Sequence, residues 1–195
     1  MPFEVVATDV PSGTARCRII DAGIRCVVRG GSGGASMAAI AAEGGVSKAL
    51  LHYHFADRAH LLAEVVTHLG RRVVTREQIA IESNMAEGPV DAFWRWIHAE
   101  LACGELRALI ALSTMRDTLV RDALASASAR RRAEAMKTVT RIFERLAIVP
   151  RVPVEWIANA SVAFMDGLVL DHAYGNRDAR VSFDVFWLAL LSLGE

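Results

Sequence analysis

The chain is poor in the features that mark several classes of protein. It has three cysteines, Cys17, Cys26 and Cys103, too few and too widely spaced for a disulfide framework or a CxxC zinc site. Five prolines and no polar low-complexity tract argue against extended disorder. No apolar run approaches the roughly 20 residues of a membrane span, and no signal peptide is recognisable. We therefore expect a cytoplasmic protein with no membrane partner, no metal and no cofactor.

The abundant residues favour helices. The 195 residues are 53% hydrophobic and 23% charged, enough for a sizeable core in one large domain or two small ones. Helix formers such as Ala, Leu, Arg and Glu dominate, and the alternation typical of strands is rare. The composition therefore predicts an all-α fold.

Positive charge is concentrated in one part of a chain whose formal net charge is zero. Residues 12–76 hold nine basic and four acidic residues, whereas the chain from Glu77 onward holds 13 basic and 16 acidic ones. A basic segment on a mildly acidic body is typical of a protein that contacts phosphate groups with one part only. The alternative is that the charges are unevenly distributed along the chain by chance and have no functional meaning.

The segment from Ser36 to Phe55 has the pattern of two short helices around a tight turn. Ser36 and Ser47 are predicted N-caps, because a serine hydroxyl can accept a free N–H of the first helical turn. Gly44 and Gly45 predict the end of the first helix. This layout places a recognition helix in the major groove of DNA.

Apolar spacing and breaks predict the other elements. Residues 1–14 are read as an N-terminal arm, and residues 30–34, rich in glycine, as a flexible connector instead of a phosphate-binding loop. A long helix from Arg58, capped by Asp57, should join the helix-turn-helix to the rest of the chain. The remaining predicted helices cover residues 15–29, 90–103, 105–116, 118–147 and 153–174, and a last helix is capped by Ser182. The run Arg130-Arg131-Arg132 is interpreted as a solvated face.

The stretch IAAEGGVSKALLHYHFADRAHLL, which begins at Ile40, closely resembles the DNA-binding head of the TetR family of bacterial transcriptional regulators. The resemblance covers about residues 16–74. It is most specific at Ile40-Ala41, Gly45-Val46-Ser47-Lys48, Leu51, Tyr53-His54-Phe55 and Leu61-Leu62. Beyond residue 74 only the helical layout is similar.

The resemblance implies a homodimer in which each subunit has a three-helix head and a larger helical body. The head would span residues 15–74 with its motif at about 36–55, and residues 75–195 would bind ligand and dimerise. It further implies a ligand-responsive regulator, most often a repressor, that binds a palindromic double-stranded DNA operator. A small apolar effector would release it from that operator.

Carried over by position, the resemblance places a set of residues at the DNA. Ser47 and Lys48 open the recognition helix, Leu50 stands where threonine is common, and His52 stands where tyrosine is common. Arg58 replaces the usual lysine at the start of the next helix. The expected DNA-binding residues are Ser36, Ser47, Lys48, Ala49, Leu50, His52, Tyr53, His54 and Arg58.

Two further sets of residues are expected in the body. Aromatic and flexible methionine side chains suit an apolar ligand, although the same residues could simply fill the core. The candidate pocket residues are Trp94, Ile97, His98, Leu101, Met115, Met136, Phe143, Phe164 and Met165. The last helices would expose an apolar patch in a monomer, so the expected dimer interface comprises Trp156, Phe164, Leu168, Asp171, Phe183, Phe186, Trp187, Leu190 and Leu191.

The competing interpretation is a helical enzyme or small-molecule-binding protein with an incidental helix-turn-helix. No convincing set of nucleophile, base and orienting acid can be assembled from the spacing of the residues, so no catalytic residue is predicted. His52 and His54 are two positions apart and would point to different faces of a helix, which disfavours a shared metal ion.

Overall fold

The computed structural model describes residues 14–84 and 88–195, so the predicted N-terminal arm lies outside the described residues except for Thr14. The described chain is all-α, as predicted, with one isolated bridge between Pro150 and Gly194. Its elements are α1 (Ala15–Gly34), α2 (Met37–Glu43), α3 (Lys48–His54), α4 (Arg58–Asn84), α5 (Pro89–Cys103), α6 (Glu105–Ala111), the 3₁₀ turn η1 (Leu112–Thr114), α7 (Thr118–Arg145), α8 (Val154–Ala173) and α9 (Ala179–Leu191). Within the described ranges, no helix combines the length and apolarity that crossing a membrane requires.

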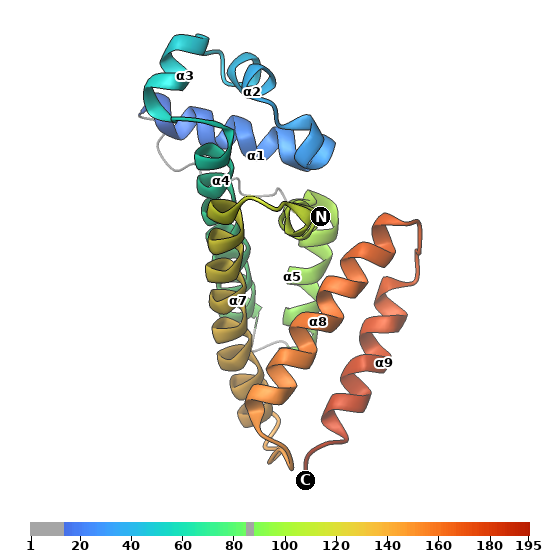
Figure 1. Cartoon of the computed structure of the whole chain (residues 1–195). Helices are drawn as coiled ribbons and strands as arrows, with labels where there is room; N and C mark the ends of the chain where they lie inside the picture. Colours follow the sequence, from blue (N-terminus) through green and yellow to red (C-terminus); the bar gives the residue numbers. More distant parts are fainter. Residues whose placement is uncertain (1–13, 85–87) are drawn as a thin grey trace.

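The helices form a small head and an elongated body (Figure 1). Helices α1 to α3 make the head at one end, and α4 runs from the head down the body beside α7. Helices α8 and α9 lie on the other side of the body. The long predicted helix from Arg58 is confirmed, and Asp57 caps it by accepting the N–H of His60 at 2.9 Å.

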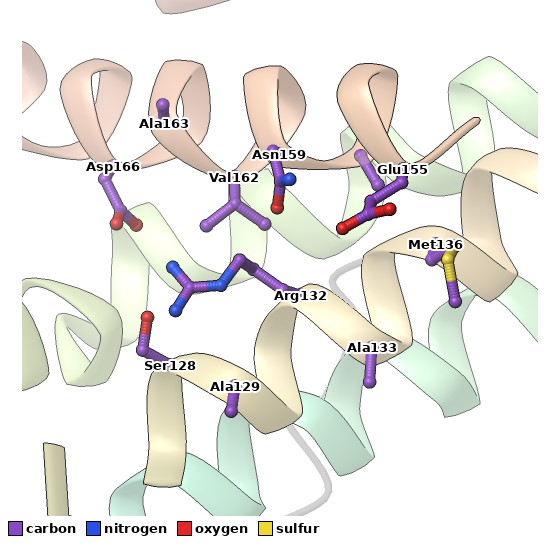
Figure 2. Close-up of a pocket in the computed structure, with 11 residues that line it drawn as sticks. Ser128, Ala129, Arg132, Ala133, Met136, Glu155, Asn159, Val162, Ala163 and Asp166 are labelled. Atoms are coloured by element: carbon purple, nitrogen blue, oxygen red, sulfur yellow. The ribbon is translucent and has the colours of Figure 1, made fainter. Parts of the chain in front are cut away.

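The body is built around a core of aromatic and aliphatic side chains. Phe93 of α5 contacts the rings of Phe183 and Trp187 of α9 as well as Trp96 of its own helix, and the ring centroids of Phe93 and Trp187 are 5.5 Å apart. Figure 2 shows a cleft between α7 and α8, into which Arg132 points. Aromatic packing therefore joins α5 to α9, and the body is indented between α7 and α8.

The prediction that the run Arg130-Arg131-Arg132 on α7 forms a solvated face is wrong for its middle residue. Arg131 is buried and donates from Nη2 to Asp166 Oδ1 of α8 at 2.6 Å. Its neighbours Arg130 and Arg132 are exposed. The reason is the helical period, which turns the middle residue of a three-residue run toward α8 while its neighbours face elsewhere.

Three predicted boundaries are also wrong. Helix α1 extends to Gly34, with a bend at Gly31 (φ 61°, ψ −158°), where the expected connector was placed. Helix α9 begins at Ala179 after Asp178, before the predicted cap Ser182. The expected helix over residues 105–116 ends at Ala111 and continues only as η1. Glycine at residue 31 permits the left-handed φ on which the bend depends.

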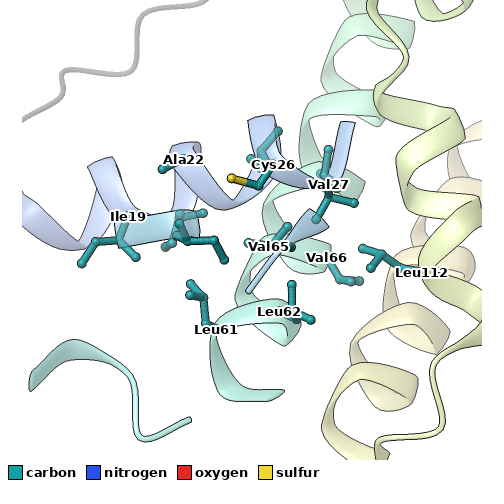
Figure 3. Close-up of a cluster of buried hydrophobic side chains, with 14 of the residues drawn as sticks. Ile19, Ala22, Cys26, Val27, Leu61, Leu62, Val65, Val66 and Leu112 are labelled. Carbon is teal, nitrogen blue, oxygen red and sulfur yellow. The ribbon is translucent and has the colours of Figure 1, made fainter. Parts of the chain in front are cut away.

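The core of the head is shared with the body (Figure 3). Ile19, Ala22 and Val27 of α1 and Leu62, Val65 and Val66 of α4 belong to one buried cluster, in which the side chains of the two helices face each other. Leu109 of α6, Leu112 of η1 and Val120 and Ala127 of α7 belong to the same buried cluster. This continuous packing ties the position of the head to the helices of the body.

Helices α4 and α7 approach most closely at Gly70. A Cβ atom at this position would lie 2.7 Å from Cβ of Ala127, which is shorter than any ordinary contact between two such atoms. Because both positions are buried in helices, neither atom can move without moving its backbone. Small residues at both positions are therefore required by the close crossing of α4 and α7.

We expect Gly70→Ala to lower the free energy of unfolding by about 1–3 kcal/mol, as overpacked core substitutions do. This loss would appear although alanine is the better helix former by about 1 kcal/mol. Denaturant unfolding monitored by circular dichroism measures it. Adding Ala127→Gly to the same chain removes the clashing atom and should recover much of the loss. A Gly70→Ala protein as stable as the parent would contradict the tight crossing.

Candidate nucleic-acid interface

The helix-turn-helix forms through the local signals that the sequence contains. Ser36 Oγ accepts the N–H of Ala39 at 3.1 Å and begins α2, and Ser47 Oγ accepts the N–H of Leu50 at 3.1 Å and begins α3. Gly45 has a φ of 60°, a left-handed conformation that favours glycine and allows the chain to turn between the helices. Both predicted caps and the predicted turn are confirmed.

Helix α3 has a buried face and an exposed face. Leu51 and the following Phe55 are buried against the rest of the head. The predicted DNA-binding residues Ser36, Ser47, Lys48, Ala49, His52 and Tyr53 are exposed, whereas Leu50, His54 and Arg58 are half-buried. Tyr53 is 82% exposed and packs edge-on against the ring of His54, with the ring centroids 5.1 Å apart. The face opposite the core is thus open to a partner.

Arg58 has a structural role that its sequence position did not reveal. Its Nε donates to the carbonyl oxygen of Ala35 at 2.8 Å, and its Nη2 donates to the carbonyl oxygen of Ser32. These carbonyls lie where α1 ends and α2 begins. Arg58 thereby fastens the start of α4 to the glycine-rich α1–α2 corner, and a phosphate contact would have to share this guanidinium.

Much of the positive charge in the head is neutralised within the head. Glu43, at the end of α2, accepts from Arg25 Nε at 2.6 Å and also from Arg29 Nη2. The hydrogen bonds from Arg29 and then Arg25 lower the pKa of the Glu43 carboxyl to about 2. Arg16 pairs with Glu64 at 3.0 Å. Arg16, Arg25 and Arg29 are therefore paired within the head and are less available to DNA than the other basic residues counted along the sequence.

The predicted pocket residues do not line one cavity. Ile97, Phe143 and Met165 are buried in the body core, and Trp94, Leu101 and Phe164 pack against it. Met115 packs against the core of the head, and His98 is exposed. Of the nine residues, only Met136 lines the α7–α8 cleft. For the three buried residues, the plain alternative of core packing describes their place in the structure.

The α7–α8 cleft has a volume of about 760 Å³ and a more polar lining than the sequence suggested. Glu155, Asn159 and Asp166 of α8 point toward Arg132 of α7 in Figure 2, with Val162 between them. Ser128, also on α7, lines the same cleft. No spacing signal in the sequence indicated this set, because its members come from two helices that meet only in the fold.

The predicted dimer-interface residues fall into three groups. Phe183, Trp187, Leu190 and Leu168 are buried within the single chain, so the expectation that they form an exposed patch is wrong. Phe164, Phe186 and Leu191 are half-buried, with the rings of Phe164 and Phe186 stacked 3.9 Å apart. Trp156 is 66% exposed, and Asp171 is exposed and accepts from Asn176.

The exposed face of α9 is apolar in its own right. Val181, Val185 and Leu188 are each more than 60% exposed, and their spacing places them on one side of the helix. These three residues have helical spacing in the sequence, but the larger residues Phe183 and Trp187 on the opposite side of the helix were predicted to form the interface instead. We use the name α8–α9 apolar face for these three side chains together with the exposed Trp156 near the start of the neighbouring helix α8.

The described residues include no group of three or more histidine, cysteine, aspartate or glutamate side chains placed to hold a metal ion. Asp166 and Asp171 have separate partners, because Asp166 pairs with Arg131 and Asp171 with Asn176.

Comparison with known proteins identifies the head. Residues 19–65 match the model of the bacterial regulatory proteins of the tetR family. A curated relative, the HTH-type transcriptional regulator BetI of Agrobacterium fabrum, is 28% identical over 165 residues, which cover 81% of this chain and 76% of BetI. The resemblance found in the sequence is thus confirmed.

Solved structures show the same fold over nearly the whole chain. A putative transcriptional regulator from Rhodococcus sp. RHA1 has a TM-score of 0.76 at 18% identity and covers 91% of this chain and 95% of its own. Reduced NemR of E. coli has a TM-score of 0.73 at 12% identity, with 93% and 98% covered. A TetR-family regulator from Agrobacterium tumefaciens has a TM-score of 0.71 at 17% identity, with 91% and 96% covered.

Proposed function

We propose that this TetR-family transcriptional regulator binds a palindromic DNA operator as a homodimer and acts as a repressor that a small-molecule effector releases. The single observation that supports DNA binding best is the open face of α3. Lys48, His52 and Tyr53 are exposed on it while Leu51 holds the helix to the head. A helix presented in this way suits the major groove, where base edges are read.

The α8–α9 apolar face supports the homodimer. Its four large apolar side chains, on two neighbouring helices, are each more than 60% exposed, which suits a contact surface. A two-fold pairing of this face with a second copy would bury it and make a four-helix bundle. Such a dimer carries two α3 helices related by symmetry, which suits an operator with two inverted half-sites.

The course of α4 supports release by an effector. This helix begins at Arg58 in the head and continues through the body to Asn84, so a shift of its body half would move the head. We propose a head of residues 15–74, a body of residues 75–195, and an effector site in the body. The apolar side chains Met136 and Val162 in the α7–α8 cleft provide contacts for an apolar effector, with polar groups around them.

Lys48→Ala tests the DNA-binding proposal. We expect about a tenfold loss of affinity for the DNA upstream of the protein's own gene, because a cation at the start of α3 would be removed from the phosphates. The slope of log affinity against log salt concentration should fall by about 1. Fluorescence anisotropy at several salt concentrations measures both quantities.

Arg145→Ala is the matched control, because Arg145 is an exposed cation at the far end of α7. This variant should bind the DNA as the parent does. Both variants should keep the thermal midpoint of the parent within a few degrees, since both sites are exposed. Equal affinities of the Lys48→Ala protein and the parent at every salt concentration would reject the proposed contact face.

A further inference from the structure

A second cleft lies where the head meets the body. Its volume is about 550 Å³, and it shares no lining residue with the α7–α8 cleft. Three parts of the chain that are distant in sequence form its walls: the end of α1, the corner between α5 and α6, and the end of α8 with the loop that follows. We name it the junction cleft. Residues from both the head and the body therefore meet around one space.

The junction cleft has an excess of positive charge on its walls. Arg107 and Arg177 line it, and neither forms an ion pair with any residue that the structure describes. Arg29 also lines it and forms an ion pair with Glu43, a carboxylate that it shares with Arg25. The acids Asp171 and Asp178 flank the loop but do not belong to the lining.

The one acidic residue in the lining does not cancel this charge. Glu100 is fully buried and accepts from Arg76 Nε at 2.6 Å and from Arg76 Nη2 at 3.1 Å. Arg76 lies outside the lining, so it neutralises Glu100 without taking space in the cleft. The guanidinium groups of Arg107 and Arg177 remain as the uncompensated charges of the cleft.

One of these guanidinium groups is held in place. Arg107 Nη2 donates to the carbonyl oxygen of Val28 of α1 at 3.2 Å. Gly104, with a φ of 72°, makes the corner between α5 and α6, and a Cβ there would be in ordinary contact with Arg107 Nη2 at 3.4 Å. The positive φ favours glycine at residue 104, and Arg107 reaches from the helix after this corner to α1.

The remaining walls are largely apolar. Val28 of α1, Leu101 of α5 and Val169 of α8 contribute aliphatic side chains, and the half-buried His172 adds a polar group whose Nδ1 lies 3.2 Å from the carbonyl oxygen of Asn176. A site of a few hundred Å³ with apolar walls and a few placed polar groups is typical of small-molecule sites. Arginine favours a planar carboxylate, which it can bind through two parallel hydrogen bonds.

We propose that the junction cleft binds a small organic anion, with a carboxylate at Arg107 and Arg177 and an apolar body against Val28, Leu101 and Val169. The anion would contact α1 of the head and α5, α6 and α8 of the body at the same time. It would therefore fix the angle between head and body. Any effect of this anion on DNA affinity rests on the proposed function, whereas binding itself does not.

Thermal unfolding of the full chain with benzoate tests the site. Benzoate carries a carboxylate on an apolar ring, benzamide is its neutral analogue, and inorganic phosphate is an anion without an apolar body. At about ten times the dissociation constant, benzoate should raise the midpoint of the parent protein by about 3 °C. Benzamide and phosphate at the same concentration should raise it by less than about a third of that.

Two variants test whether the benzoate-induced rise in the thermal midpoint arises at the junction cleft. Arg107→Gln/Arg177→Gln should lose the benzoate shift relative to its own midpoint without benzoate, whereas Arg145→Gln, which removes an exposed cation far from the cleft, should keep it. An equal shift in the double variant and the parent would overturn the site. No benzoate shift in the parent would overturn it as well, and equal shifts from benzamide or phosphate would overturn the class of ligand.

A second measurement separates this site from the proposed function. DNA affinity is measured by anisotropy with and without benzoate, in the parent and in the double variant. A change in affinity confined to the parent supports both the site and its regulatory role. A thermal shift in a protein that binds no DNA supports the site and rejects the proposed function, whereas DNA binding without any thermal shift rejects the site alone.

Discussion

Arg76→Ala should lower the free energy of unfolding by about 3–5 kcal/mol, the usual cost of removing one partner of a buried ion pair. Arg76 donates to both carboxylate oxygens of the fully buried Glu100 and from Nη1 to Glu105 Oε2 at 2.7 Å. Without the guanidinium, the Glu100 carboxylate would remain in the interior without a counter-charge. Denaturant unfolding at pH 7 measures the loss.

A paired replacement is the control. Arg76→Met/Glu100→Leu removes both charges and fills their space with apolar atoms, so it should recover most of the loss. Glu105 keeps a partner in this variant, because Arg72 Nη2 lies 2.9 Å from its Oε1. If the single variant loses less than about 1 kcal/mol, or if the paired variant is no more stable than the single one, the buried pair does not have the expected role.

The same network connects the head to the body. Arg72 of α4 bridges Glu105 of α6 and Asp21 of α1, the latter at 3.4 Å. Arg107 of α6 reaches the carbonyl oxygen of Val28 of α1. The head and the body are thus joined by these polar contacts in addition to the shared apolar core of α1, α4, α6 and α7. A ligand that moves α6 relative to α4 would therefore act on the head through polar and apolar contacts together.

The head could be predicted from the sequence because its signals are local. Each N-cap of α2 and α3 depends on one serine and a backbone N–H three residues later. The turn depends on Gly45 adopting a positive φ. Such features need only a few consecutive residues, so sequence spacing is sufficient to place them.

The surface of the body could not be predicted in the same way. Helix α9 has Phe183 and Trp187 on one side and Val185 and Leu188 on the other, and both stripes have helical spacing. Periodicity alone cannot decide which stripe faces the core, because that depends on where α5 lies. The larger aromatic residues pack against α5, which leaves the smaller aliphatic residues outside.

The ion pairs between residues far apart in the sequence could not be predicted, for a related reason. Arg131 lies 35 residues from Asp166, and Arg25 lies 18 residues from Glu43. Each pair forms only after two helices have packed. A count of basic residues along the sequence therefore overestimates the number of basic side chains that have no acidic partner. The caps and turn of the helix-turn-helix, which depend on neighbouring residues, were predicted from the sequence, whereas these ion pairs were not.

Glu77→Gln should raise the free energy of unfolding at pH 8 by about 3 kcal/mol while changing it little near pH 4. Glu77 lies on α4 and is 3% exposed, with one hydrogen bond, in which Thr138 Oγ1 donates to its Oε1 at 2.8 Å. Burial raises the pKa of its carboxyl from 4.5 to about 7. The folded protein therefore keeps this proton between pH 4.5 and 7, whereas the unfolded chain releases it.

The sign of the pH dependence follows from that difference in protonation. The folded state binds more protons in this window, so the stability contributed by Glu77 is fully present below pH 4.5 and falls until about pH 7. Glutamine keeps the acceptor for Thr138 and cannot ionise, so the variant should lack this part of the decline. Denaturant unfolding from pH 4 to 8 compares the two proteins. The control is Glu82→Gln, an exposed glutamate on the same helix, whose stability should run parallel to that of the parent. Parallel curves for the Glu77→Gln protein and the parent would show that the Glu77 carboxyl is already ionised in the folded state at low pH, and that burial in the body core does not hold its proton.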